Sequence, residues 1–69
     1  PVRVGDWVRG VRQPLLGQVG EILALQEESQ RVPSGLSLAG AQVVFATEYP
    51  QEGERQFVPW LNLELIADG

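Results

Sequence analysis

The sequence predicts an all-β fold: a small barrel of about five strands, with one 3-10 turn before the last strand. Three observations support this. Short apolar segments alternate with turn residues, as in strands joined by tight turns. No segment repeats its apolar residues with the period of about 3.6 that indicates a helix. Gly20 lies within an apolar segment, where a glycine usually marks a bulge or bend of the kind that closes a barrel.

The first two strands are expected at residues 4–12 and 18–25. Residues 4–12 open with a Gly-Asp turn and then alternate, which places Trp7 and Arg9 on one face. The segment 13–17 contains a proline that starts a turn and a glycine that ends it. We therefore expect two strands joined by a short turn.

Residues 26–40 predict a long loop, because they are first polar and then rich in turn formers. Loops above about 12 residues are uncommon in compact domains and tend to be functional or mobile. We expect Leu36 and Leu38 to fold back onto the barrel. The alternative is that residues 32–40 form a docking arm whose two leucines insert into a partner.

The second half predicts three strands and a helical turn. A strand at 41–47 leads into a hairpin turn at 48–54, which contains proline and glycine. The return strand at 55–58 is stopped by a proline. A single 3-10 turn at 60–62 then precedes a closing strand at 63–66.

Composition excludes several classes of chemistry. The 69 residues make one domain, spanning 1–69, with no cysteine and no histidine. Disulfides are excluded, and so are zinc, haem and copper sites that need thiolate or imidazole. The commonest general base and the best nucleophile are also missing, so we expect neither an enzyme nor a cofactor. Because so short a chain buries little surface, we expect it to associate with a partner or with itself.

The net charge is −4, with five arginines and no lysine. Nucleic-acid binders normally carry a basic surplus, because phosphate contacts supply most of their non-specific affinity. The charge therefore disfavours nucleic acid and favours a protein partner with a basic surface. The apolar runs are far below the roughly 20 residues that cross a bilayer, and no signal peptide is evident. We expect no membrane contact and a cytoplasmic location, or a stromal one in a photosynthetic cell.

The predicted order of elements resembles the SH3-like barrels, and the first half is similar to their KOW-type strand pair. The matching residues are Gly5 and Asp6, Val8 and Arg9, and the Gly-Gln-Val-Gly-Glu-Ile run at 17–22. This resemblance implies a fold more than a function. KOW and Tudor-like barrels that bind nucleic acid supply one alternative reading.

The second half resembles the variable chain of ferredoxin–thioredoxin reductase, which belongs to the same structural group as a small barrel subunit of photosystem I. The matches are Gly-Glu-Ile at 20–22, Arg31 with Ser-Gly-Leu at 34–36, Val-Val-Phe at 43–45 and Leu-Glu-Leu-Ile at 63–66. That family's histidine in the fourth strand has no counterpart here. The resemblance implies a non-catalytic accessory barrel that braces an enzyme or docks a redox partner.

A third resemblance is to the plasmid-borne type II dihydrofolate reductases. It is carried by residues 55–59 with Leu63 and Glu64 behind them. It implies a homotetramer in whose pore Gln56 contacts folate and nicotinamide. Val58 stands where that family has tyrosine.

Four aromatic residues are candidates for a groove that binds a protein partner: Trp7, Tyr49, Phe57 and Trp60. Tryptophan is enriched at interaction hot spots. Trp60, on the expected helical turn, has an equally good alternative as a plug at the barrel end.

Arg3, Arg9 and Arg12 form a candidate basic patch along the first strand, with Trp7 on the face of Arg9. Such a patch would suit phosphate, nucleic acid or an acidic protein. The favoured alternative is that Trp7 packs at a rim while the arginines pair with acidic neighbours such as Asp6 or Glu21.

Glu48, Glu52 and Glu54 crowd the predicted hairpin. Paired carboxylates can hold a cation or act as acid and base, but such work usually needs burial. We expect a solvated acidic turn that can steer a basic partner, and no metal site.

Taken together, the residues favour a non-catalytic protein-interaction module or an accessory subunit of a larger complex, such as a redox complex. The first alternative is a nucleic-acid-binding barrel that uses the arginine patch. The second is a homotetrameric reductase of the type II kind.

Overall fold

The computed structural model describes residues 2–31, 34–45 and 55–69. These residues form five antiparallel strands in one sheet, and their single helical element is a 3-10 turn. No helix among the described residues could cross a membrane. The elements are β1 (Trp7–Gly10), β2 (Val19–Arg31), β3 (Ser37–Phe45), β4 (Arg55–Pro59), η2 (Trp60–Asn62) and β5 (Leu63–Ala67). The predicted fold class, an all-β domain of five strands with a 3-10 turn before the last, is confirmed.

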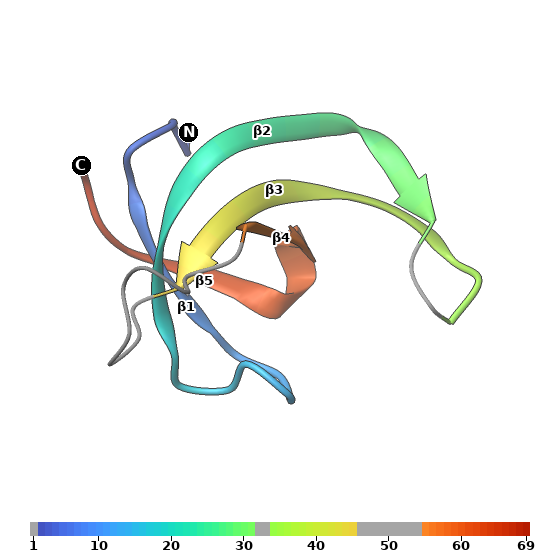
Figure 1. Cartoon of the computed structure of the whole chain (residues 1–69), viewed down its shortest axis with the longest axis horizontal. Coiled ribbons are helices and arrows are strands. Elements are labelled where there is room, and N and C mark those ends of the chain that lie inside the picture. Colours follow the sequence, from blue (N-terminus) through green and yellow to red (C-terminus); the bar gives the residue numbers. More distant parts are fainter. Residues whose placement is uncertain (1, 32–33, 46–54) are drawn as a thin grey trace.

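The strands lie in the order β4-β3-β2-β1-β5. β2 is central and long enough to pair with β1 near its start and with β3 from Gly20 to Arg31, with a break in the ladder between Gln26 and Gln30. Figure 1 shows β2 and β3 running side by side in one long arch, with β1 and β5 crossing at its foot. The 3-10 turn η2 joins the two edge strands, β4 and β5, directly.

The hydrophobic core lies inside the arch and draws on four strands. Ile22 and Val43 are fully buried, and Val8 is only 1% exposed. Burying such a side chain stabilises the fold by about 1.5–3 kcal/mol. The complete set of buried apolar residues is Val8, Ile22, Ala41, Val43, Phe45 and Val58.

Gly20 is a glycine because β3 passes very close to it. A Cβ built there would lie 2.6 Å from Cγ1 of Val43 and 2.8 Å from the carbonyl oxygen of Val44. Of the two features expected at Gly20, a bulge or a bend, the bulge is not observed, since the pairings of Gly20 with Val8 and Phe45 are regular. The ladder shifts register a little further along, between Ile22 and Ala24.

The prediction of a long loop over residues 26–40 is wrong. β2 continues to Arg31 and β3 begins at Ser37, and these two residues face each other in the ladder. The polar composition suggested a loop, but the backbone N–H and C=O groups of a polar segment can pair in an antiparallel ladder as those of an apolar segment do. We call residues 26–31 and 34–40 the β2–β3 arm.

One carboxylate is buried in the described part. Oδ2 of Asp6 accepts a hydrogen bond from the backbone N–H of Arg3 at 2.8 Å, and Oδ1 accepts one from the backbone N–H of Gly69 at 3.1 Å. These two hydrogen bonds, the one from Arg3 most, lower the pKa of Asp6 below its ordinary value. Burial opposes this, but the charge of Arg3 adds to the lowering.

Candidate functional site

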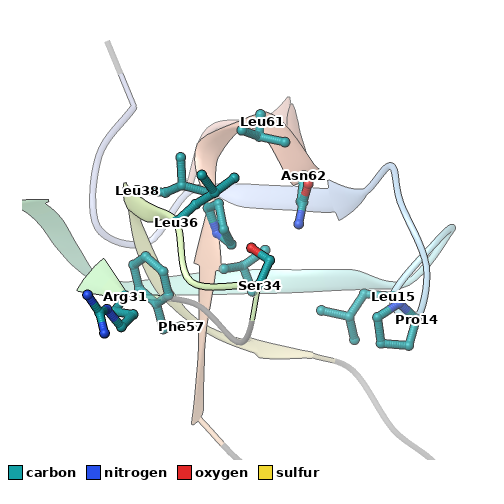
Figure 2. A pocket seen from close by; sticks show the side chains of 11 residues that line it. Pro14, Leu15, Arg31, Ser34, Leu36, Leu38, Phe57, Leu61 and Asn62 are labelled. Atoms are coloured by element: carbon teal, nitrogen blue, oxygen red, sulfur yellow. The ribbon is translucent and has the colours of Figure 1, made fainter. Parts of the chain in front are cut away.

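A groove of about 630 Å³ lies where the turn before β2, the β2–β3 arm, β4 and η2 meet (Figure 2). Binding sites for ligands usually have volumes of about 300–1,000 Å³. The apolar lining consists of Pro14, Leu15, Leu36, Leu38, Phe57, Val58, Pro59 and Leu61, and the polar lining of Arg31, Ser34 and Asn62. We call this feature the apolar groove.

The two most exposed leucines of the groove stand on tight turns. Leu36 is 62% exposed and follows Gly35, whose φ of +90° lies in the region that only glycine adopts without strain. Leu61 is 52% exposed and lies in the middle of η2. Since β4 ends in Pro59, its ladder stops where η2 begins.

Contacts from the start of the chain hold η2 in place. The backbone N–H of Val11 donates to the carbonyl of Asn62 at 2.9 Å. The guanidinium of Arg12 donates to the carbonyl of Leu61 at 3.2 Å. These two contacts fix the wall of the groove that carries Leu61 against the end of β1.

Asn62 is the notable polar residue of the groove. Its Oδ1 atom is buried and has no hydrogen-bond partner among the described residues. A buried acceptor without a partner costs about 1–3 kcal/mol. In Figure 2 the Asn62 side chain projects into the space between Leu61 and Leu15. The amide group can both donate and accept, as a peptide group does.

The charge of the groove differs in sign from that of the chain. The net charge of the chain is −4. Arg31 lines the groove, and no aspartate or glutamate of the described residues does. The groove is therefore an apolar surface with a positive end.

The four predicted aromatic residues do not form one groove in the described part. Phe57 lines the apolar groove, but Trp7 and Trp60 are not among its lining residues. Trp7 is 38% exposed on the outward face of β1 and is paired with Glu21. Trp60 packs against the buried core, which agrees with its alternative reading as a plug. Tyr49 lies outside the described residues.

Leu61 and Asn62 are groove residues that the sequence pattern does not single out. In a 3-10 turn successive side chains point about 120° apart, so η2 must turn some residues inwards and others outwards. The sequence leaves two readings of Trp60 equally open, an outward groove residue and a plug at the barrel end. The larger apolar ring packs inwards, and the groove receives the two smaller residues.

The three arginines of the predicted basic patch have different neighbours. Nε of Arg9 lies 3.4 Å from Oε1 of Glu64, and both side chains are about half exposed. Such exposed pairs contribute about 0–1 kcal/mol. Arg12 contacts η2, whereas Arg3 lies beyond the other end of β1, beside Asp6. Pairing of Arg9 with an acidic residue was expected, although with Asp6 or Glu21 rather than with Glu64.

The predicted acidic turn, with Glu48, Glu52 and Glu54, lies outside the described residues. Among the residues that are described, no three carboxylates come close enough together to hold a metal ion. The described part therefore offers the apolar groove as its candidate site.

Comparisons with protein-family models, with curated proteins and with solved structures find no match to this chain. The resemblances drawn from the sequence therefore stay predictions. Function has to be argued from the groove itself.

Proposed function

We propose that this chain is a non-catalytic protein-interaction module, or the accessory subunit of a larger complex, and that its apolar groove binds an extended segment of another protein. The observation that carries the proposal is the combination of exposed leucines with an amide side chain in one apolar groove. Leu36 and Leu61 are both more than half exposed, and Asn62 lies among the groove residues.

An extended segment of protein fits both parts of this combination. Its apolar side chains would cover Leu36 and Leu61, and burying a leucine fully is worth about 1.5–3 kcal/mol. One of its backbone carbonyls could accept a hydrogen bond from the amide nitrogen of Asn62, which is the end of that side chain that points into the groove in Figure 2. Extended backbones offer such unpaired groups at regular intervals.

The lining favours binding over catalysis. Arg31 is the ionisable residue among the described residues that line the groove. A guanidinium stays protonated in proteins, so it does not serve as a general acid or base. The whole chain contains no histidine or cysteine that another segment could bring to the groove.

The test is a selection of displayed random peptides on the purified chain, followed by titration of labelled synthetic peptides. Leu61→Asp places a charge in the groove, and we expect it to weaken binding at least tenfold. Leu65→Asp is the matched control, because Leu65 is 47% exposed on β5 and lies away from the groove. We expect the control to bind as the wild type does. Melting curves of both variants show whether each remains folded.

Two outcomes would contradict the proposal. Selection could enrich no peptide, or the enriched peptides could bind Leu61→Asp and the wild type equally well. Titration of RNA and DNA oligonucleotides at low salt gives a further check. Micromolar binding of an oligonucleotide, with no peptide bound, would favour the nucleic-acid reading instead.

A further inference from the structure

We propose that the segment bound in the apolar groove carries an acidic residue, and that Arg31 is the residue that recognises it. This inference rests on the proposed function, and it goes further by giving the chemistry and the orientation of the partner. It also reverses the expectation from net charge, which favoured a partner with a basic surface.

The arginines are distributed unevenly about the groove. Arg31 lines it, and Arg12 donates to the carbonyl of Leu61 in its wall. Arg55 is two residues before Phe57 on β4, so the two residues share a face of the strand. No acidic side chain of the described part lines the groove. The described lining is thus positive where Leu36 and Leu61 are exposed, although the whole chain is acidic.

The charge of the residue that docks is decided by the side chains that it contacts, because salt screens the charges that lie further away. At physiological salt, exposed charges further apart than about 8 Å hardly interact. A carboxylate in the groove would instead meet Arg31 beside the apolar surfaces of Phe57 and Leu36, where the lower effective dielectric strengthens the attraction. The net charge of −4 governs the approach of the partner, but not the residue that docks.

Arg31 is well placed to recognise a carboxylate. It is the last residue of β2, and its backbone is fixed by pairing with Ser37. The planar guanidinium can bind a carboxylate through two parallel hydrogen bonds. In Figure 2 Arg31 and Phe57 lie at one end of the view, and Pro14 and Leu15 lie at the other. The acidic residue of the segment would therefore lie at the arm end, with its apolar residues towards the turn before β2.

The experiment compares two displayed peptide libraries with the same randomised apolar core, one flanked by aspartates and the other by lysines. We expect the wild-type chain to enrich the aspartate-flanked library, with binding that weakens as salt is added. Arg31→Gln should lower affinity for a synthetic aspartate-flanked peptide by about fivefold, the effect of a partly exposed ion pair. Its affinity for the same peptide with asparagine flanks should not change.

Arg9→Gln is the matched control, because it removes the same charge from a residue paired with Glu64 outside the groove. It should keep the preference for aspartate. Equal enrichment of both libraries, or equal loss in the two variants, would overturn the role of Arg31 while leaving the groove as a binding site. No enrichment of either library would defeat the proposed function itself. Displacement of the peptide by an oligonucleotide, with the same dependence on Arg31, would also overturn the inference.

Discussion

The two halves of β2 belong to very different environments. At its start, Ile22 is fully buried between β1 and β3. At its end, Arg31 is exposed beside Leu36, which is 62% exposed. One continuous strand thus runs from the buried core, which stabilises the fold, into the exposed β2–β3 arm. Mutations in the core should therefore change stability, whereas mutations in the arm should change binding.

The largest expected effect contrasts a core side chain with a groove side chain. Ile22→Ala should destabilise the fold by about 2–5 kcal/mol, because it leaves a cavity in the core. Leu36→Ala should cost less than about 0.5 kcal/mol, because little contact is lost at an exposed site. Urea unfolding followed by circular dichroism measures both. Similar losses in the two variants would show that Leu36 is part of the core.

A smaller contrast uses two glycines. Gly20→Ala places a Cβ against Val43 and Val44, so overpacking should cost about 1–3 kcal/mol. Gly35→Ala meets nothing within 4 Å, so its cost should be the backbone strain at its positive φ alone, about 1–2 kcal/mol. Thermal melting of the two variants ranks them. If Gly35→Ala were the more damaging, the arm would be more important for stability than this account allows.

The smallest expected effect on stability comes from Asp6 and appears only in acid solution. Its folded pKa is lowered below the ordinary value of 3.8, so the ionised form stabilises the fold. That stabilisation is present above the ordinary pKa and is lost as the pH falls through the lowered one. Asp6→Asn should therefore lose less stability on acidification than the wild type does. Urea midpoints between about pH 6 and pH 2 test this, and parallel curves would mean that Asp6 is not held as described.

The sequence predicted what depends on local residues and missed what depends on distant pairing. Pro59 followed by residues 60–62 indicated the 3-10 turn, and the apolar run after Gly40 indicated the central part of β3. The paired strands of the arm were missed because residues 26–31 are polar, as loops usually are. Only the pairing of this segment with β3 makes it a strand.

The site was predicted less well than the fold. Phe57, one of the four aromatic candidates, lines the apolar groove, but Leu61 and Asn62 were not considered. Which residues of η2 face outwards is set by packing of Trp60 against the core. That packing involves residues from several strands, so no local pattern reveals it.

The proposed binding surface is the apolar groove and not the face of β1. The most direct test follows the backbone amide chemical shifts of the labelled chain while a selected peptide is added. We predict that the largest changes occur at Leu36, Leu61 and Asn62, with none at Trp7 and Arg9. Changes centred on Trp7 and Arg9, with Leu36 and Leu61 unaffected, would contradict the account.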